Sequence, residues 1–550
     1  MVFKNDDKLE IPTVDILSCF DDTKVPSDKP VYIDAFDPKR QYTHGQARTT
    51  IRKLVAGLRK AGLRQGDVVC VHSFNDINYP VLANGIIAAG GIYSGTNPAY
   101  QPYELAHAIK VARIKFLVVE PEILKHALEA ATASSLPQEN IFIFNNRDDQ
   151  VVPSGFKSWR TLLQHGEEDW VRWDDAERSK STTAAHLFSS GTTGLPKAAM
   201  LSHYNLIAQH CQITEWKPKP YAIKKITATP MFHVATAPTC HFSPLKDGAD
   251  TVIMRRFDTE GYLKSIQDHQ ITDVATVPPM VLSIIQSDLE DKYSLKSVKF
   301  ATCGAAPLEK RQQARFQALL SEGAVFTQVW GMTETTCICT NTPFPGEDDT
   351  GSVGRPVPGI ELKLVDAEDP TKEIHEYGVR GEVCIRGVTV IRGYLDEQAT
   401  RDSWDSDGFF HTGDIAYCEK GTGKWYIVDR KKDLMKVRGF QVAPPELEAV
   451  LLEHPGVYDA AVIGVKKNKD DDSEYPRAYI VRRDNDEGRR LDGKAVFEYM
   501  GTKLAKFKRP EGGVVFMDAI PKNPSGKILK RELREIAAVE MKKERQESKL

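Results

Sequence analysis

Val68-Val69-Cys70-Val71-His72 and Lys115-Phe116-Leu117-Val118-Val119 are the two strand-like runs that decide the fold class. The amphipathic stretch Thr50 to Leu63 precedes the first run, and a further helix-length segment separates the two. Strands that alternate with helix-length segments are typical of a parallel, doubly wound sheet. The region from about Gln46 to Val119 is therefore predicted to form an α/β layer.

A second series of the same kind runs from Ile226 to Thr327. It contains the strand-like runs Val274-Ala275-Thr276-Val277 and Val298-Lys299-Phe300-Ala301. The alternation again predicts a doubly wound α/β subdomain. From about Gly354 to Tyr426 the pattern changes to short β-rich pieces interrupted by glycine, which predict a small β-barrel-like subdomain.

After Asp429 the pattern changes once more. A helix is expected from Pro445 to Glu453, followed by the strand Asp459 to Val465 and a further α+β mixture. We therefore expect an N-terminal domain at 1–429 and a small C-terminal domain at 430–550.

Bulk properties limit the classes of protein that remain. A chain of 550 residues is too long for one hydrophobic core. Its 41% apolar and 27% charged residues are ordinary globular values, which argues against a disordered or fibrous protein. A net charge of -3 argues against a nucleic-acid-binding protein that relies on a basic surface. A phosphate-bearing ligand must therefore be recognised by local geometry.

The nine cysteines include no pair at the two-residue spacing of a zinc or redox motif, so they are interpreted as reduced structural thiols. The start of the chain lacks the apolar run of a secretory signal. The longest apolar stretch, Val81 to Ile92, is too short to span a bilayer and is predicted to be a buried helix. A soluble protein with no integral membrane segment is expected.

The last three residues, Ser548-Lys549-Leu550, match the peroxisomal address that an import receptor reads. The alternative is a chance tripeptide on a basic, helix-forming tail. We favour the address, because a specific tripeptide at one fixed position is rare by chance. It predicts a location in the peroxisomal matrix and the import receptor as a partner.

A Ser/Thr/Gly-rich loop carries the first chemical signal. The strand-like Thr183 to Phe188 runs directly into Ser189-Ser190-Gly191-Thr192-Thr193-Gly194-Leu195-Pro196-Lys197. Clustered N–H groups, hydroxyls and one ammonium suit a polyphosphate. The loop is not a Walker loop, because the Gly-Lys-Ser/Thr ending is missing. Read alone, it also fits a flexible surface turn.

This loop resembles the phosphate-binding signature of the adenylate-forming superfamily, which includes acyl-CoA synthetases, 4-coumarate:CoA ligases and beetle luciferases. The resemblance extends, in the family's order, over nearly the whole chain. The further matching segments are Met200-Leu201-Ser202-His203, Gly304-Ala305-Ala306-Pro307-Leu308, Trp330-Gly331-Met332-Thr333-Glu334-Thr335, Gly408-Phe409-Phe410-His411-Thr412-Gly413-Asp414, Asp429 to Val442, and Pro521-Lys522-Asn523-Pro524-Ser525-Gly526-Lys527. An ATP-dependent acid:CoA ligase is expected, with ATP, Mg²⁺ and coenzyme A as cofactor and co-substrates.

The resemblance implies a nucleotide site. Glu334 follows the strand-like Val325 to Trp330, so it lies where open α/β sheets bind ligands, and it is implied to hold Mg²⁺ together with Thr193. A lone glutamate is otherwise an ordinary solvated charge. Trp330 stands where tyrosine is more usual against adenine. The implied ATP contacts are Ser189, Ser190, Gly191, Thr192, Thr193, Gly194, Lys197, Gly304, Ala305, Ala306, Trp330, Gly331, Thr333, Asp414, Arg430 and Gln441.

The resemblance also assigns roles in the C-terminal part. Asp414 is implied to accept hydrogen bonds from the ribose hydroxyls. Lys527 matches the adenylation lysine, whose ammonium bridges the acid and the α-phosphate. Lys432 matches the hinge position about which the family's small C-terminal domain rotates. The resemblance therefore implies that the domain at 1–429 binds nucleotide and acid and that the domain at 430–550 is mobile. Lys436, Gly439 and Gln441 match the face of the small domain that serves thioester formation, with Gly439 on the coenzyme A side. The implied catalytic set is Lys527, Lys436, His233 and Glu334.

The resemblance also implies a pocket that binds the carboxylic acid. His233 matches the pocket entrance of acid:CoA ligases, where amino-acid-activating relatives place an aspartate. The pocket residues are expected to be His233, Ala235, Thr239, Thr302, Ala305, Val329 and Gly331. Ala235 stands where plant 4-coumarate ligases place a tyrosine, and Val329 narrows one side. Together they favour an aliphatic or simple arylalkanoic acid.

Several other functions fit the same motifs. A 4-coumarate-type (hydroxycinnamate) CoA ligase and a luciferase-like adenylating oxygenase share the adenylation chemistry. A module that loads a carrier protein would need a separate partner, since the chain after Lys527 is too short for a carrier domain. A sensor that has lost catalysis is disfavoured by the joint presence of Glu334, Asp414, Lys436 and Lys527.

Overall fold

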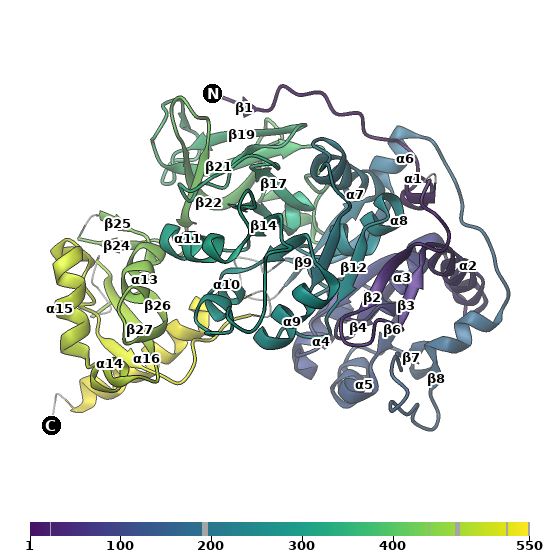
Figure 1. Ribbon diagram of the computed structural model, residues 1–550, viewed down its shortest axis with the longest axis horizontal. Coiled ribbons are helices and arrows are strands. Elements are labelled where there is room, and N and C mark those ends of the chain that lie inside the picture. The colour runs from purple at the N-terminus through teal and green to yellow at the C-terminus, as the bar shows by residue number, and fades with distance from the viewer. Residues whose placement is uncertain (22–23, 190–195, 439, 468–472, 524–525, 548–550) are drawn as a thin grey trace. The chain divides into compact units, whose positions relative to one another are not determined.

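The computed structural model describes residues 1–21, 24–189, 196–438, 440–467, 473–523 and 526–547 (Figure 1). Its contacts divide the chain into two compact units. The large unit comprises residues 2–362 and 384–411, and the small unit comprises residue 1 together with 363–383 and 412–550. The domain boundary predicted between residues 429 and 430 stays a prediction.

The first predicted α/β layer of the large unit is confirmed. Four parallel strands alternate with helices in the order β4, α3, β5, α4, β6, α5, β7, and all five residues of β4 are buried, as expected for a strand covered on both faces. The sheet order is β10 (Lys197–Ser202), β9 (Thr183–Ser189), β5 (Ile92–Thr96), β4 (Val68–His72), β6 (Ile114–Val119), β7 (Ile141–Ile143) and β8 (Lys157–Ser158). The helices are α2 (His44–Lys60), α3 (Asn78–Ala88), α4 (Pro102–Val111) and α5 (Leu124–Ala133).

The second layer is also present, but it includes two strands that the sequence did not indicate. Its order is β15 (Val325–Gln328), β14 (Phe300–Cys303), β13 (Asp273–Thr276), β11 (Lys224–Thr227), β12 (Asp250–Ile253), β2 (Pro30–Asp34) and β3 (Gln41–Thr43). Thus β2 and β3 come before the first layer in the sequence, but they are strands of the second sheet, where β2 pairs with β12. The helices α9 (Thr259–His269), α10 (Pro278–Ile285) and α11 (Lys310–Leu319) connect its strands.

The predicted β-rich segment forms a third, mainly antiparallel sheet. Its order is β1 (Phe3–Lys4), β19 (Ile360–Val365), β21 (Gly381–Gly387), β22 (Phe410–Cys418) and β23 (Trp425–Arg430), and β20 (Glu373–Ile374) pairs with β19. After β23, the small unit has an α+β arrangement, as predicted. It contains β24 (Met435–Val437), β25 (Phe440–Val442), α13 (Pro444–Leu452), β26 (Val457–Val465), β27 (Tyr475–Arg482), α15 (Gly493–Lys503), β28 (Val514–Phe516) and α16 (Lys530–Glu547).

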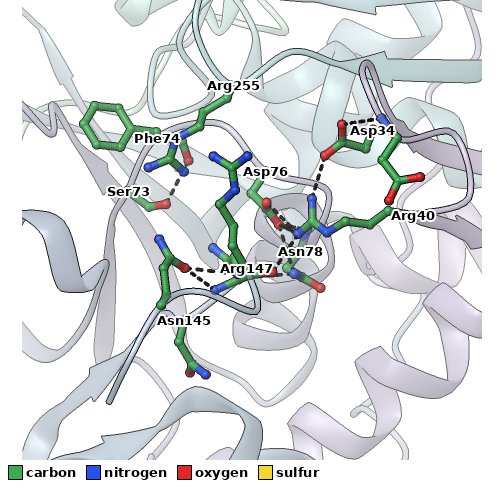
Figure 2. Close-up of polar contacts among 12 residues, drawn as sticks. Asp34, Arg40, Ser73, Phe74, Asp76, Asn78, Asn145, Arg147 and Arg255 are labelled. Atoms are coloured by element: carbon green, nitrogen blue, oxygen red, sulfur yellow. Dashed lines mark hydrogen bonds and ion pairs between the residues drawn. The ribbon is translucent and has the colours of Figure 1, made fainter. Parts of the chain in front are cut away.

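Two groups of ion pairs join the two α/β layers at the carboxyl ends of their strands, and Figure 2 shows the group around Arg40. Arg40, in the turn between β2 and β3, donates to Asp34 at 2.8 Å and to Asp76, which follows β4, at 2.7 Å. Arg255, after β12, pairs at 2.7 Å with Glu120, which follows β6. Asp76 is 5% exposed and Glu120 is fully buried. Burial raises the pKa of Asp76 and Glu120, and the arginines oppose this shift.

The nine cysteines are all buried thiols, in line with a structural role. Among the helices of the described residues, none is long and apolar enough to cross a membrane. The apolar stretch Val81 to Ile92 divides between the buried helix α3 and the start of β5.

Candidate active site

In the large unit, the loop that starts at Ser189 and ends at Lys197 is anchored by the antiparallel pair β9 and β10. Ser189 and Lys197 are direct partners across this pair. Ser189 Oγ donates to Glu334 Oε1 at 2.5 Å, and Tyr394 donates its hydroxyl to the same oxygen at 2.6 Å. The Lys197 ammonium lies 5.4 Å from the centre of the Tyr394 ring. The structure therefore brings together Ser189, Lys197 and Glu334, which were predicted from two separate motifs.

Glu334 belongs to a short turn, Thr333–Thr335, that follows β15 and β16 (Trp330–Met332). Glu334 is 3% exposed, and both Ser189 and Tyr394 donate to its Oε1. Among the described residues no donor is found for Oε2. A buried carboxylate with one oxygen left over suits a hard cation such as Mg²⁺. Thr333, a predicted nucleotide contact, is buried beside it.

The predicted adenine and acid contacts meet at the ends of β14 and β15. Thr302 lies in β14, and Val329 follows β15 with its N–H donated to the Cys303 carbonyl at 2.9 Å. A Cβ built on Gly304 would lie 3.0 Å from Val329 Cγ2. Ala305 has a φ of +71°, and Ala306 follows it in the same turn. The turn is thus tightly set between two strands.

Gly331 is required by the backbone that surrounds it. A Cβ at this position would lie 1.5 Å from the Cys337 carbonyl oxygen across the pair of β16 and β17 (Cys337–Asn341). Trp330, the predicted adenine-packing residue, is 7% exposed.

His233 lies in a turn that follows β11. Its N–H donates to the Pro230 carbonyl at 3.1 Å, and the Ala235 N–H donates to its Nδ1 at 3.1 Å. The Thr239 carbonyl accepts from Lys225 Nζ at 2.8 Å. A Cβ built on Gly95, in β5, would lie 2.8 Å from the Cβ of Phe232, so this turn packs closely on the first sheet.

In the small unit, Asp414 and Arg430 are direct partners on β22 and β23. Asp414 is 7% exposed, and its carboxylate lies 3.4 Å from Arg430 Nε. The preceding Gly413 has a φ of +70°, which favours glycine. Burial, followed by the positive charge of Arg430, lowers the pKa of Lys432.

Lys527 lies in the same part of the small unit. Its N–H donates to Asn523 Oδ1 at 2.8 Å, and its carbonyl accepts from the Asn523 N–H at 2.9 Å, so the backbone of Lys527 is held against Asn523. Burial and then the charge of Arg430 lower the pKa of Lys527 to about 8, while Asp414 opposes the shift. The structure thus gathers Asp414, Arg430, Lys432 and Lys527, which the sequence places more than 100 residues apart at their extremes.

Lys436 is exposed on β24 and pairs with Gln441 on β25. Six predicted residues fall outside the described part of the chain: Ser190, Gly191, Thr192, Thr193, Gly194 and Gly439. The targeting tripeptide at 548–550 also lies outside it.

Tyr394 was not predicted. It holds Glu334 and lies over Lys197, and its sequence signal is limited to an Arg-Gly-Tyr turn after β21. Its neighbour in the site, Glu334, is 60 residues earlier, so no local pattern links them. Within the described residues, no group of three or more His, Cys, Asp or Glu side chains is arranged to hold a metal ion.

Comparison with known proteins identifies the family. The model of the AMP-binding enzymes matches residues 20–395, and that of the AMP-binding enzyme C-terminal domain matches residues 446–527. The acyl-CoA ligase azaF of Aspergillus niger is 49% identical over 96% of this chain and 100% of its own length. The phenylacetyl-CoA ligase epaB of the same species is 49% identical over 96% of this chain and 98% of its own.

Solved structures agree with the fold. ATP-bound MatB from Rhodopseudomonas palustris is 28% identical, with a TM-score of 0.82, over 95% of this chain and 98% of that one. The chain therefore belongs to the AMP-binding enzymes and, within them, to the acyl-CoA ligases, which activate a carboxylic acid as an acyl-adenylate and transfer it to coenzyme A.

Proposed function

We propose that the acid activated by this ligase is an arylalkanoic acid of the phenylacetic type or a short aliphatic acid. The support comes from Ala235 and Val329, which remove a phenol-binding hydroxyl and narrow the predicted pocket, and from the 49% identity to a relative named a phenylacetyl-CoA ligase. A hydroxycinnamate would leave its phenolic hydroxyl without a partner at position 235, which costs affinity.

ATP is proposed to bind with its phosphates on the 189–197 loop and beside Glu334. Mg²⁺ would be held by Glu334 Oε2 and would neutralise charge on the phosphates. The support is the buried carboxylate whose two hydrogen-bond donors both contact Oε1. Tyr394 and Ser189 fix the orientation of that carboxylate. Asp414 would accept from the ribose hydroxyls, with its position set by Gly413 and Arg430.

Lys527 supplies the mobile positive charge for the first step. The acid oxygen attacks the α-phosphorus of ATP, a new P–O bond forms, and pyrophosphate leaves. The Lys527 ammonium lies against the carboxylate and the α-phosphate and offsets their repulsion. In the second step the thiolate of coenzyme A attacks the acyl carbon and AMP leaves. No protein nucleophile is required, in line with nine buried cysteines.

A panel of acids tests the substrate. CoA-dependent AMP release is measured with phenylacetate, 3-phenylpropionate, hexanoate, cinnamate and 4-coumarate. We expect the highest kcat/KM among the first three. An Ala235→Tyr variant is expected to gain 4-coumarate activity relative to phenylacetate. A wild-type preference for 4-coumarate would overturn the proposed substrate class and leave the ligase assignment intact.

We also propose that the protein is imported into the peroxisomal matrix through its last three residues, on the support of their match to the import address. A fluorescent protein fused to the amino terminus should co-localise with a peroxisomal marker. Deletion of Leu550 should leave it in the cytosol, because the address is read only at the end of the chain. Unchanged import of the deleted form would refute the proposal.

A further inference from the structure

A cavity of about 400 Å³ lies in the large unit at the amino ends of β4, β5 and β9. Its lining includes Gln65 before β4, Gly91 before β5 and Thr183, the first residue of β9. Ser189, by contrast, is the last residue of β9. A seven-residue strand is roughly 20 Å long, so the cavity is remote from the candidate active site.

The walls of the cavity are mainly apolar and aromatic. Leu63 and Ile87 contribute aliphatic surface, and Trp170 and Trp173 contribute indole rings. Trp170 Nε1 donates to Ser18 Oγ at 3.2 Å, and Trp173 Nε1 donates to Ser179 Oγ at 2.9 Å. Because both indole N–H groups are already used, the rings can offer only their carbon surface to a ligand. This is the composition of a small-molecule site.

Two polar groups of the lining have unused donors. Arg178 lies 4.3 Å from the centre of the Trp173 ring, and among the described residues its guanidinium has no ion-pair partner. His203 is 5% exposed and packs edge-on to Trp173 at 4.8 Å. The Ile16 N–H donates to His203 Nδ1 at 3.1 Å, which places the ring proton on Nε2. Within the described part of the chain, Nε2 meets no acceptor.

The other charged groups of the lining are satisfied. Arg59 pairs with Glu168 at 2.9 Å. Asp15 is 2% exposed, and its carboxylate accepts from the N–H groups of Ser18 at 2.9 Å and Trp173 at 3.3 Å. Burial lowers the pKa of His203 to about 3, so the imidazole is neutral and donates from Nε2. The unused recognition groups are thus one guanidinium and one neutral N–H donor.

We propose that this cavity is a second, non-catalytic binding site for a monocarboxylate with a compact aromatic or aliphatic body. The carboxylate is bound between Arg178 and the Nε2–H of His203, and the body packs against Trp170, Trp173 and Ile87. A bidentate guanidinium and one further donor match the two oxygens of a carboxylate. The ligand class overlaps that of the proposed substrate, so the enzyme senses an acid at a site apart from the one that activates it.

The test is calorimetric titration of the full-length protein with phenylacetate, with and without saturation of the active site by a sulfamoyl analogue of phenylacetyl-adenylate. We expect one equivalent of phenylacetate to bind to the blocked wild type. Arg178→Gln should weaken this binding at least about tenfold, because a charge-assisted contact is lost. Arg172→Gln is the matched control. Arg172 also stacks on an indole, at 4.2 Å from the Trp170 ring, but it does not line the cavity.

A second arm leaves the protein unchanged. Phenylacetamide has the same shape without the charge, and it should bind the blocked wild type at least about tenfold more weakly than phenylacetate. No binding of phenylacetate to the blocked wild type, or equal binding of acid and amide, would overturn the proposal. The proposal would also be overturned if Arg178→Gln had the melting temperature of the wild type and still bound phenylacetate as tightly as the wild type does. Because the readout is heat and not turnover, these outcomes do not depend on which acid the enzyme activates. If the analogue fails to bind, the titration is made with the unblocked proteins. Arg178→Gln should then bind one equivalent of phenylacetate fewer than the wild type, and this difference reports the second site.

Discussion

Lys527 carries a charge that its surroundings disfavour. Burial and the neighbouring Arg430 lower its pKa to about 8, so the ammonium begins to lose its proton just above neutral pH. If the protonated form is the one that assists adenylation, kcat/KM for ATP in acid-dependent pyrophosphate release should fall as the pH rises through about 8, since kcat/KM reports the free enzyme. Lys527→Arg should shift this alkaline limb upward, because a guanidinium stays charged.

Lys522 provides the control for this prediction. It lies on the same loop and pairs with Asp459 at 2.6 Å. Lys522→Arg should leave the alkaline limb where it is in the wild type. If Lys527→Arg retains activity with the limb unmoved, another group is titrating and the assignment of Lys527 to adenylation fails.

At the scale of elements, the carboxyl ends of the two α/β layers depend on Arg40. Its guanidinium compensates Asp76, which is 5% exposed (Figure 2). Arg40→Met would leave that carboxylate buried without its partner, which typically costs about 3 to 5 kcal/mol. We expect a loss of this order in the free energy of unfolding at pH 8, measured with urea by circular dichroism.

The pH dependence of this loss follows from Asp76. Burial already raises its pKa in the folded state, and removal of Arg40 takes away the main opposing charge, so the pKa rises further. A carboxyl group whose pKa is higher in the folded than in the unfolded state destabilises the fold while it is ionised, and it does so less once it is protonated. The loss of unfolding free energy in Arg40→Met should therefore shrink as the pH falls from 8 to 5. The exposed Lys39→Met should cost little at either pH. A deficit that does not depend on pH would contradict this account.

The elements that could be predicted are those with a local pattern. The bounds of β4 agree with the predicted run to the residue, because the run is a dense apolar stretch that follows Gly66 and Asp67. By contrast, β2 pairs in parallel with β12, more than 200 residues away, and nothing near Pro30 in the sequence specifies that partner. Sequence patterns predict that a strand exists more readily than which strand it pairs with.

The same limit applies to the candidate site. Glu334 could be predicted because it follows a strand within a recognisable motif, whereas Tyr394, which donates to it at 2.6 Å, could not. The tyrosine reaches the site only through the folding of the β21 segment against β10, where Ala199 bridges to Tyr394. A residue that positions another through tertiary contact leaves little trace in the sequence around it.

At the scale of the whole molecule, the two lysines of the small unit are predicted to serve different half-reactions. Lys527 lies with Asp414 and Arg430, whereas Lys436 is exposed on the β24 and β25 hairpin. If the two lysines serve successive steps, Lys527→Ala should slow acid-dependent pyrophosphate release by about a hundredfold or more while a preformed acyl-adenylate still reacts with coenzyme A. Lys436→Ala should show the reverse, with normal pyrophosphate release and accumulation of the adenylate.

Rapid quench with radiolabelled acid measures both steps in one experiment, since acid, adenylate and thioester are separated and counted. The neighbouring Arg438→Ala is the control for the hairpin, because Arg438 is also exposed but pairs with Glu511 at 2.6 Å. It should leave both rates near those of the wild type. If Lys436→Ala and Lys527→Ala slow both half-reactions equally, one arrangement of the molecule serves both steps, and the mobile C-terminal domain predicted from the sequence is not needed for turnover.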